Sequence, residues 1–437
     1  MSLRKGWYFS GSLLRWPAGP TPDKSLPALR RVVERAHRDN AWYRRHFATA
    51  GFHPSMLESL ADFERVPLLH RHDFDASPEA LYLRRPRPPH EVVLTTSGTL
   101  GEPLRVIHSR EAVDRSTACF ARWLWKLGFH PPLRLAMYRT PGELATATRF
   151  WYHRLGLMKK LWIDAAAEPA VQLSELRRFK PDLLFAYPYA LLWIVTHLLA
   201  PDEPLGFAPQ AVVSFGEYLS PQIRTILEGR LQVPIYNWYA STEFWGLAGQ
   251  CRECGHLHLE PETTYLEVLH EGRPVIGKRG TVVCTSLHND LMPLIRYVVG
   301  DEARLEHTVC ACGYRGPSLV EVGGYRSKKK TALAHWEKIL SSIEETLIGQ
   351  GNLAAVQLEV QIETGELVVR YVRGARFEPQ DPHRLEQLVY NLGIPVKLFL
   401  LEVGRIAPLA SGKQAHLLIR DEEPHNSSRG KLGKLSR

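Results

Sequence analysis

The stretch Thr95–Pro103 reads TTSGTLGEP and places two glycines among four hydroxyl side chains, directly after the apolar run Val92–Leu94. The apolar run predicts a strand. A loop of small side chains that leaves a strand can bring its backbone N–H groups close to a phosphate, and glycine permits the tight curvature that this requires. The stretch therefore predicts a nucleotide-phosphate loop, although the same composition is also typical of an ordinary turn.

The composition is that of a globular chain with large buried cores. The chain has 437 residues, 44% of them hydrophobic, which predicts about two or three domains. The net charge of +9 suits anionic ligands without selecting one. Near the start, Arg15 and Pro17 interrupt the apolar residues, so no secretory signal is expected and the cytoplasm is the expected compartment.

One long uncharged run, Leu183–Ala200, approaches the length of a membrane span. Pro188 divides it into a strand-like half and a helical half, and His197 interrupts the second half. We therefore expect a buried strand followed by a helix, and no membrane partner.

Strands alternate with helices from Val92 to Tyr236, a pattern typical of parallel sheets covered by helices. After Tyr265 the pattern changes to short β-rich pieces separated by turns. The expected helices are Ser25–Ala50, Arg110–Leu127, Leu144–Leu155, Ala190–Leu199, Pro221–Leu231, Trp336–Leu347 and Pro382–Leu392. The expected strands include Leu133–Tyr138, Leu161–Asp164, Leu183–Tyr187, Ala211–Phe215, Ile235–Tyr236, Ala355–Ile362, Glu366–Val372 and Val396–Val403.

The predicted fold class is α/β, with two domains and a basic tail. A large N-terminal α/β domain with parallel-type sheets and a small β-rich part is expected over residues 1–324. Gly323–Gly324 marks the expected hinge, and a small mobile α+β domain is expected over residues 325–422. The basic stretch 423–437 is expected to be disordered.

A polar cluster, NWYASTE, occupies Asn237–Glu243 after the short Ile-Tyr strand. Its amide, aromatic, hydroxyl and carboxylate groups could contact an adenine, a phosphate and Mg²⁺ within one site. The alternative is a polar helix start, with Ser241 as the N-cap and Glu243 in the first turn.

Two further stretches carry candidate ligand-binding groups. The run Arg296–Asp301, RYVVGD, places a carboxylate after a glycine at an expected strand end, where it could bind ribose hydroxyls or belong to a simple β-turn. The run Gly404–Lys413, GRIAPLASGK, presents Lys413 on a Gly-Ser loop. That lysine could reach a phosphate or a carboxylate, or it could be one more solvated surface cation.

Taken in order, the Thr95–Pro103 loop, YASTE, YVVGD and SGK resemble the motifs of the adenylate-forming enzyme superfamily, which comprises acyl-CoA synthetases and adenylation domains. The nearest resemblance is to phenylacetate–CoA ligases. It extends over most of the chain, including AWYRRHFATAGF, LLFAYPYAL, SFGEYLSPQIR and MPLIRYVVGD. The resemblance implies the adenylate-forming fold, with a small C-terminal lid domain that moves over the large domain.

The resemblance also implies roles for individual residues. Those implied to bind ATP are Ser97, Gly98, Thr99 and Gly101 for the phosphates, Gly216, Glu217, Asn237 and Tyr239 for the adenine, and Asp301 with Arg326 for the ribose. Thr242 is implied to bind phosphate, Glu243 to bind magnesium, and Lys413 to be the catalytic lysine.

The chain departs from the family pattern in several places. Leu100 stands where the loop usually has threonine, Glu102 where it usually has lysine, and Ala240 where the YASTE turn usually has glycine. The hinge sequence GYRSKKK lacks the usual aspartate. The segment MYRTPGELATATRF differs from the glycine-rich segment that helps to form the aryl pocket in phenylacetate–CoA ligases. The sequence therefore does not identify the carboxylic acid substrate.

Four of the six cysteines form two pairs, each followed by glycine: Cys251 with Cys254, and Cys310 with Cys312. Cys-Gly turns point backbone N–H groups at sulfur, and four thiolates make a closed tetrahedral zinc site. We therefore expect a structural zinc within an insertion around residues 251–312, with His256 or His258 as a possible substitute for one thiolate. The alternative is a set of reduced, unpaired cysteines.

The implied reaction is the ATP-dependent activation of a small-molecule carboxylic acid to an acyl-adenylate, with release of pyrophosphate and transfer to a nucleophile. The implied cofactors are ATP and Mg²⁺, with CoA as the expected acceptor. A carrier-protein thiol or an amine stays open as acceptor, and so does a homodimer. Nucleic-acid binding is disfavoured because the basic residues are scattered and the aromatic residues are not interleaved with them. A non-catalytic descendant that binds nucleotide or a partner remains the rival, favoured by Leu100 and Ala240.

Overall fold

The computed structural model describes residues 22–73, 78–83, 91–95, 104–139, 157–200, 203–325, 330–361, 364–391, 393, 395–407, 413 and 416–420. The chain divides into two compact units. Unit 1 comprises residues 1–330 together with 409–413, and unit 2 comprises residues 331–408 and 414–437.

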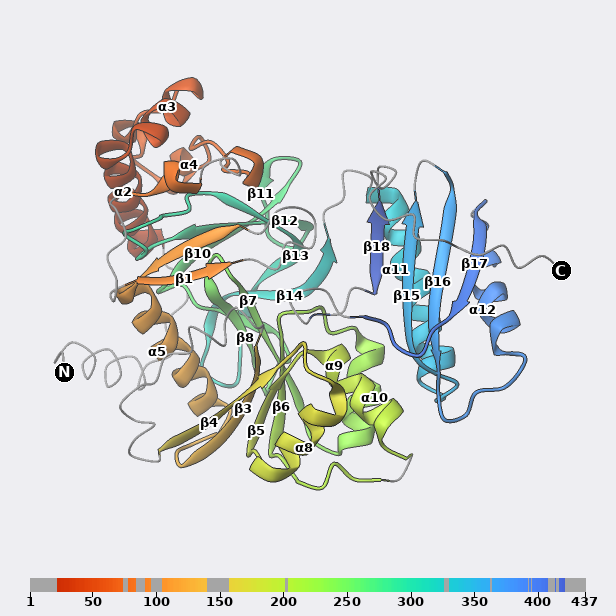
Figure 1. Cartoon of the computed structure of the whole chain (residues 1–437). Helices are drawn as coiled ribbons and strands as arrows, with labels where there is room; N and C mark the ends of the chain where they lie inside the picture. The colour runs from red at the N-terminus through yellow and green to blue at the C-terminus, as the bar shows by residue number, and fades with distance from the viewer. Residues whose placement is uncertain are drawn as a thin grey trace. The chain divides into compact units, whose positions relative to one another are not determined.

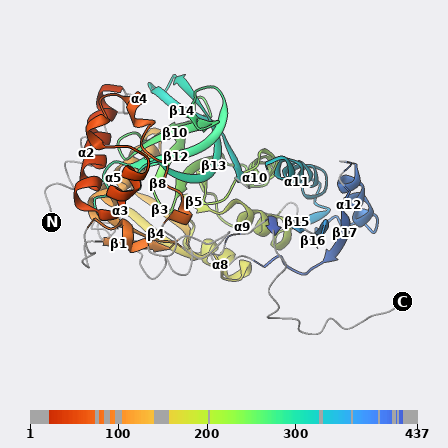
Figure 2. The ribbon, with the colours of Figure 1, turned by 90° about the horizontal axis from the view of Figure 1, so that it is seen from above.

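Unit 1 begins with two amphipathic helices, α2 (Pro22–Asp39) and α3 (Ala41–Thr49), joined at Asn40. Asn40 caps α3 by accepting the backbone N–H of Tyr43, which satisfies one of the donors left free at a helix start. The buried side of α3 carries Tyr43 and Phe47, and the hydroxyl of Tyr43 donates to the carbonyl of Pro293 at 2.5 Å. Figure 2 shows these helices beside strands β10 and β12.

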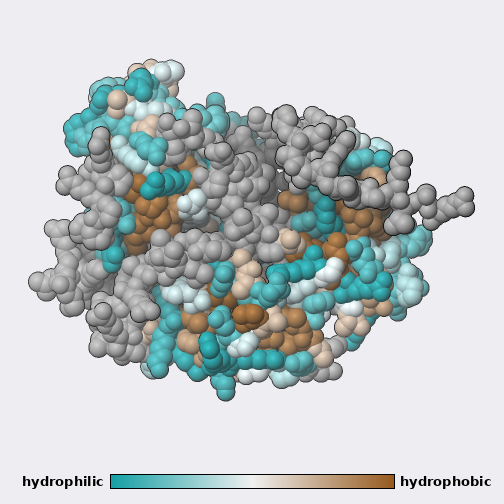
Figure 3. Space-filling view, viewed as in Figure 1, coloured by the Kyte–Doolittle hydropathy of each residue, from teal (hydrophilic) through white to brown (hydrophobic). Residues whose placement is uncertain are grey.

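The outer surface of these helices is mainly hydrophilic, as the teal region at the upper left of Figure 3 shows. Four short turns and helices follow them along the chain. They are η1 (Pro54–Met56), α4 (Leu60–Phe63), η2 (Arg71–Asp73) and η3 (Pro78–Leu81).

Unit 1 contains a twelve-stranded mixed sheet in the order β11-β10-β12-β13-β14-β9-β8-β7-β6-β5-β3-β4. Its strands are β3 (Leu133–Arg139), β4 (Met158–Asp164), β5 (Leu183–Ala186), β6 (Ala211–Phe215), β7 (Ile235–Ser241), β8 (Trp245–Gln250), β9 (Leu257–Leu259), β10 (Thr264–His270), β11 (Arg273–Pro274), β12 (Arg279–Ser286), β13 (Tyr297–Val309) and β14 (Arg315–Tyr325). Strands β7, β6, β5, β3 and β4 are parallel, and the remaining pairs are antiparallel.

Helices cover both faces of the parallel strands, as expected for buried parallel sheets. Figure 1 shows α5 (Arg110–Lys126) on one side and α8 (Pro169–Phe179), α9 (Pro188–Trp193) and α10 (Pro221–Leu231) on the other. On the α5 side, the rings of Trp123 and Trp238 lie 4.7 Å apart. Ser109 caps α5 by accepting the backbone N–H of Ala112.

The Thr95–Pro103 stretch follows strand β1 (Glu91–Thr95), which pairs antiparallel with β2 (Arg105–Ser109). The predicted strand before the loop is therefore present, and the second strand was not anticipated. Residues 96–103 lie outside the described part of the chain.

Unit 2 has a four-stranded sheet in the order β17-β16-β15-β18. Its elements are α11 (Lys330–Ile343), η5 (Glu344–Ile348), β15 (Leu353–Gln361), β16 (Glu366–Arg373), α12 (Asp381–Tyr390), β17 (Lys397–Glu402) and β18 (Leu417–Arg420). Helix α11 begins at Lys330, the last residue of the main stretch of unit 1, and the remaining elements belong to unit 2. The α+β character expected for the C-terminal part is confirmed, and the domain bounds from sequence remain a prediction.

The structure confirms several local expectations and corrects others. The run Leu183–Ala200 forms β5 and then α9, which begins at Pro188 and continues as the π-helical turn η4 (Ile194–Leu198). No helix in the described ranges is long and apolar enough to cross a membrane. Helix α8 was missed, and the expected helix Leu144–Leu155 lies entirely in the undescribed range 140–156.

The structure excludes one alternative and corrects one expectation about the motifs. Asn237–Ser241 continues strand β7, so the polar helix start is excluded, and Ser241 instead accepts the backbone N–H of Phe244 in the β7–β8 turn. Asp301 lies within the long strand β13 rather than at a strand end. Gly300 has φ 105°, and the ladder shifts register between Asp301 and Glu302, so a bulge sets the direction of the aspartate.

Candidate active site

The candidate site lies where parallel strands β5, β6 and β7 end, which is where open α/β sheets bind ligands. Gly216 follows β6 with φ 74°. A Cβ atom there would lie 2.9 Å from Cε1 of Tyr187, the residue after β5. Gly216 is therefore required both by its backbone conformation and by the approach of the Tyr187 ring.

Two more of the implied adenine-binding residues belong to the same edge. The carboxylate of Glu217 accepts the backbone N–H of Tyr189 at 3.4 Å, in the first turn of α9. The backbone N–H of Asn237, on β7, donates to Oε1 of Gln250 at 2.8 Å on β8. These contacts tie the turn after β6 to α9, and β7 to β8.

The hydroxyl of Tyr239, on β7, donates to Oδ2 of Asp301, on β13, at 2.7 Å. Burial raises the pKa of Asp301 above its ordinary value, while the hydrogen bond from Tyr239 and the charge of Lys413 act in the opposite direction. Burial and the neighbouring Asp301 carboxylate raise the pKa of Tyr239 far above its ordinary value, so its hydroxyl remains a donor. The pair joins two implied nucleotide-binding residues that are distant in the sequence.

Lys413 belongs to unit 1 by its contacts, as the last residue of the short stretch 409–413, whereas the chain before and after that stretch belongs to unit 2. Its Nζ lies 5.8 Å from the centroid of the Tyr187 ring, within the range of a cation–π interaction. A Cβ atom on Gly216 would lie 3.5 Å from Cε of Lys413. The structure thus brings Lys413, Tyr187, Gly216 and Asp301 to one place.

Glu243 lies in the turn after β7, and its carboxylate accepts the hydroxyl of Tyr297 at 3.3 Å. Burial raises the pKa of Glu243 above its ordinary value. Hydrogen bonds from its own backbone N–H, from Ser241 and from Tyr297 act in the opposite direction, as does the charge of Arg71. A carboxylate in these surroundings can be compensated by a bound cation.

A histidine side chain on β2 holds the backbone of the YASTE turn in place. Nε2 of His108 lies 2.8 Å from the carbonyl oxygen of Thr242. Burial lowers the pKa of His108 to about 4, so the ring is neutral at physiological pH and Nε2 donates to that carbonyl. Thr242 is therefore held by its backbone next to Glu243.

A small cavity of about 20 Å³ lies against Glu243, large enough for about one water molecule. Most of its lining residues are of polar types, and they come from β2, α5 and the antiparallel strands with their turns. The lining residues are His108, Ala112, Ser116, Glu243, Phe244, Trp245, Thr263, Thr264, Ser286, His288 and Asn289.

Several implied site residues lie outside the described ranges. They are Ser97, Gly98, Thr99, Gly101 and Arg326. Their roles remain predictions.

The paired cysteines lie on two hairpin turns at the same end of the sheet. Cys251 and Cys254 lie between β8 and β9, and Cys310 and Cys312 lie between β13 and β14, while β9 pairs with both β8 and β14. The backbone N–H of Glu253 points at Sγ of Cys251 at 3.4 Å. The Cys251–Cys254 turn therefore has the form expected for a metal-binding knuckle.

Four ligand atoms, from Cys251, Cys254, His258 and Cys310, lie within 4.8 Å of one another. Sγ of Cys251 and Sγ of Cys310 are 3.7 Å apart. A tetrahedron with zinc–sulfur bonds of about 2.3 Å has edges of roughly 3.8 Å, so this spacing fits. Sγ of Cys312 lies 3.9 Å from Nδ1 of His258, which leaves either residue available as the fourth ligand.

His256, the other substitute considered from sequence, has its Nδ1 3.2 Å from the hydroxyl of Thr308. It does not belong to the four-atom group in the described residues.

Sequence reasoning missed two residues of the site, His108 and Tyr187. Tyr187 follows an expected strand and precedes Pro188, and the end of a parallel strand is a recognisable position for a ligand contact. His108 carries no comparable local signal, because it reaches the YASTE turn from a distant segment.

Comparison with known proteins places this geometry in a wider context. No family model matches the chain. The phenylacetate-coenzyme A ligase of Escherichia coli K12 is 24% identical over 410 residues, which cover 88% of this chain and 91% of that protein. The phenylacetate-coenzyme A ligase of Thermus thermophilus is 24% identical over 432 residues, covering 89% and 94%.

Solved structures show the same fold. A 2-hydroxyisobutyryl-CoA ligase, in the postadenylation state with an acyl-AMP, superimposes with a TM-score of 0.71 at 20% identity, covering 91% of this chain and 89% of that chain. The same ligase with 2-HIB-AMP and CoA in the thioesterification state gives a TM-score of 0.60 at 21% identity, covering 92% and 91%. The fold and the similarity to phenylacetate–CoA ligases inferred from the motifs are confirmed.

Proposed function

We propose that this chain, which has the adenylate-forming fold and is similar to phenylacetate–CoA ligases, is an AMP-forming acid–CoA ligase. It would activate a carboxylic acid with ATP and transfer the acyl group to the thiol of CoA. The observation that carries the proposal is the meeting of Lys413, Gly216, Tyr239 and Asp301 at the ends of parallel strands.

The chemistry proceeds in two balanced steps. A carboxylate oxygen attacks the α-phosphorus of ATP, the bond from that phosphorus to the bridging oxygen breaks, and pyrophosphate leaves with the bonding electrons. The CoA sulfur then attacks the acyl carbon, the carbon–oxygen bond to AMP breaks, and the thiol proton is lost. The first step is needed because a free carboxylate repels nucleophiles, whereas AMP is a good leaving group.

The residues would act mainly by electrostatics. Lys413 would lie between the carboxylate and the α-phosphate and attract both anions. Asp301, oriented by Tyr239, would accept hydrogen bonds from the ribose hydroxyls. Magnesium, when bound, would neutralise phosphate charge, and Glu243 supplies a hard oxygen ligand of the kind that this cation prefers.

A structural zinc at the Cys251, Cys254 and Cys310 thiolates belongs to the same proposal, with His258 or Cys312 as fourth ligand. Four protein ligands leave no open position, so the metal would pin the β8–β9 turn to the β13–β14 turn and take no part in the reaction. The distance of 3.7 Å between Sγ of Cys251 and Sγ of Cys310 fits a tetrahedral zinc site and supports this proposal.

Measurement of the zinc content of the protein and its variants tests the proposed metal site. We expect about one zinc per chain by elemental analysis, and loss of zinc and of folded yield in Cys254→Ser, because metal binding is coupled to folding. Comparison of His258→Ala with Cys312→Ser identifies the fourth ligand, since only the variant that lacks a true ligand should lose the metal. Cys119→Ser is the control, because that thiol lies on α5, away from the hairpin turns. Full zinc retention in Cys254→Ser would exclude this ligand set.

ATP–pyrophosphate exchange tests the adenylation step across a panel of acids. The panel should include phenylacetate and 2-hydroxyisobutyrate, which the names of the relatives suggest, together with aliphatic and amino acids. Formation of acyl-CoA with the acid that exchanges best then tests the acceptor, with a carrier protein and free amines as the alternatives. Failure of every acid to support exchange would leave the rival, a chain that binds nucleotide without catalysis.

A further inference from the structure

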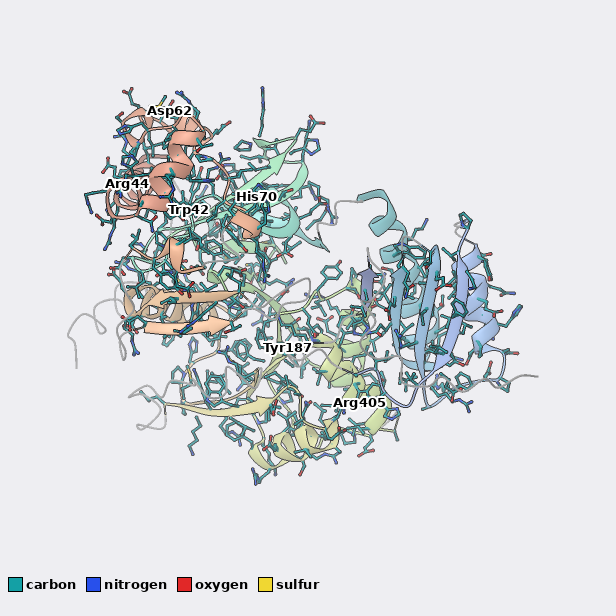
Figure 4. The ribbon with its side chains drawn as sticks, turned by 45° about the horizontal axis from the view of Figure 1, so that its top comes forward. Trp42, Arg44, Asp62, His70, Tyr187 and Arg405 are labelled. Carbon is teal, nitrogen blue, oxygen red and sulfur yellow. The ribbon has the colours of Figure 1, made fainter. Side chains whose placement is uncertain are left out.

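Strand β17 forms one edge of the small sheet in unit 2 and exposes apolar side chains there. In Figure 1 and, with side chains drawn, in Figure 4, it is the outermost strand of this sheet, on the side away from β18. Phe399 is 38% exposed and Leu401 is 45% exposed. Among the described residues of unit 2, β17 pairs with β16 alone. An edge strand of this kind is a position where a further strand can add to a sheet.

The hydrogen bonds toward β16 show which main-chain groups of β17 face the open edge. The N–H of Lys397 donates to the carbonyl of Gly365 at 3.0 Å, and the N–H of Val403 donates to the carbonyl of Tyr371 at 2.9 Å. Residues that bond to the neighbouring strand alternate along a parallel ladder with residues that face away from it. The residues of β17 whose N–H and C=O groups face away from β16 are therefore Leu398, Leu400 and Glu402.

The side chains of β17 divide between the two faces of the sheet. Leu398 and Leu400 lie in register with two fully buried residues of β16. Because side chains in register point to the same face, these leucines belong to the packed face of the sheet. Phe399 and Leu401 alternate with them and therefore point to the opposite face, where they are exposed.

A second copy of β17 fits this edge in an antiparallel arrangement. With Leu400 opposite Leu400 of the second copy, each outward-facing N–H and C=O group gains a partner, since directly opposite residues exchange both hydrogen bonds. The same register places Phe399 opposite Leu401 of the second copy, and Leu401 opposite its Phe399. Residues in such non-hydrogen-bonded pairs approach most closely, so the exposed apolar side chains cover each other. One register therefore satisfies both the main chain and the side chains.

The charges at the two ends of β17 are complementary to those of a second copy. The strand begins at Lys397 and ends at Glu402, with no charged residue between them. Each end also pairs with β16 on the exposed surface, through Glu366 at 2.9 Å and Arg373 at 2.8 Å. Antiparallel pairing lays the basic start of one copy beside the acidic end of the other, whereas parallel pairing would bring like charges together.

We propose that β17 is a docking surface for a second copy of this chain. The two copies join about a twofold axis, and their four-stranded sheets become one continuous sheet. The contact consists of main-chain hydrogen bonds and two apolar side chains from each copy, which is less than a permanent dimer buries. The dimer is therefore reversible and forms as the protein concentration rises, independently of the proposed reaction.

Sedimentation velocity of the full chain at increasing concentration tests the proposal. We expect a monomer at low concentration and a dimer at high concentration. Leu401→Lys places a charge opposite Phe399 and beside Lys397 of the second copy, and the change occurs twice in a twofold dimer. It should raise the dissociation constant of the dimer by roughly tenfold to a hundredfold. Val171→Lys is the matched control, because it charges an apolar side chain that is similarly exposed, on α8 of unit 1.

Two outcomes of this experiment overturn the proposal. One is a wild-type monomer at every concentration. The other is a dimer that Leu401→Lys leaves intact, because the copies would then meet through another surface. Circular dichroism verifies that the variant is folded, as expected for the replacement of an exposed side chain.

Cysteine cross-linking checks the register without introducing a charge. A mixture of Phe399→Cys and Leu401→Cys should form a disulfide-linked dimer under mild oxidation, because opposite residues in a non-hydrogen-bonded pair lie within reach of a disulfide. Either variant by itself should form much less, since its two new cysteines are diagonal neighbours about 7–8 Å apart. The wild-type chain, with its own six cysteines, is the control. Equal cross-linking of the mixture and of each variant alone would overturn the proposed pairing.

Residue-resolved hydrogen exchange distinguishes a second copy from a segment of the same chain. The amides of Leu398, Leu400 and Glu402 should exchange quickly in dilute solution and slowly at high protein concentration. The amides of Lys397 and Val403 should stay protected in both, because their hydrogen bonds lie within unit 2. Protection of the outward-facing amides that does not depend on concentration would show that the same chain covers this edge, which contradicts the proposal.

Discussion

The hydroxyl of Tyr239 and the carboxylate of Asp301 form a 2.7 Å hydrogen bond between β7 and β13, across the strands β8, β9 and β14 that separate them in the order of the sheet. The bond fixes the orientation of the carboxylate and favours its ionised form. Both effects are lost if the hydroxyl is removed, so Tyr239→Phe isolates the contribution of this single contact.

We expect Tyr239→Phe to raise the KM for ATP by roughly tenfold, the usual effect of losing a hydrogen bond to a charged group. The hydrogen bond lowers the pKa of Asp301, so its loss should raise that pKa further. Because ribose binding needs the ionised carboxylate, the acid limb of kcat/KM for ATP should move to higher pH. An unchanged pH profile measured by exchange would contradict this role.

Glu243→Gln should abolish Mg²⁺-dependent exchange while leaving the fold intact. Burial raises the pKa of this carboxyl, so its ionised form destabilises the folded chain at neutral pH, and the amide should make the chain equally or more stable there. Below about pH 4 the carboxyl is protonated in both the folded and the unfolded chain, so any gain in stability of the Glu243→Gln variant should disappear there. Exchange at the wild-type rate would refute the magnesium assignment.

Lys413→Ala should slow adenylation by about a hundredfold to a thousandfold, the effect of removing one preorganised charge donor. Transfer from a supplied acyl-adenylate to CoA should change little if the small domain turns between the steps and takes the lysine away. Both half-reactions should be measured on one preparation, with circular dichroism to verify folding. Equal losses in both would argue against domain movement, and no loss in either would leave Lys413 a surface residue.

Arg296→Met should destabilise unit 1 by about 3–5 kcal/mol, because it leaves the carboxylate of Glu267 buried without its partner. Burial already raises the pKa of Glu267, and loss of the arginine should raise it further, so the deficit should be largest at neutral pH and should shrink toward pH 4. Urea denaturation at several pH values measures this.

The matched control for that experiment is Arg304→Met, because Arg304 pairs with Glu321 on the exposed surface. Its cost should stay within about 1 kcal/mol. Equal effects of the two substitutions would contradict a structural role for the buried pair.

Local sequence patterns predicted the elements whose apolar period and caps agree with their tertiary surroundings. Helix α10 begins at Pro221 and ends at Leu231 as expected, because Ser220 supplies the cap and the chain leaves the helix at Gln232 in a left-handed conformation. Strand β6 matches its expectation because all of Ala211–Phe215 is apolar or small and lies between neighbours on both sides.

The same reasoning failed where polar residues continue a strand. NWYASTE contains turn-forming residues, and only its pairing with β8 keeps Asn237–Ser241 extended. Asp301 follows a glycine that resembles a turn, but β12 and β14 hold the chain in β13 on both sides, and the irregularity is taken up as a bulge. Pairing partners that are distant in sequence decided these conformations.

The sequence by itself determined the types of chemical group in the site, since the hydroxyl, carboxylate and lysine motifs and their order are visible without a structure. Only the tertiary structure decided which groups meet: Tyr239 with Asp301, Lys413 with Tyr187, and Tyr297 with Glu243. The reason is physical. A motif is recognised from residues that are neighbours along the chain. These contacts depend instead on the order of the strands and on buried hydrogen bonds such as those of Arg296, which join segments hundreds of residues apart and leave no local pattern in the sequence.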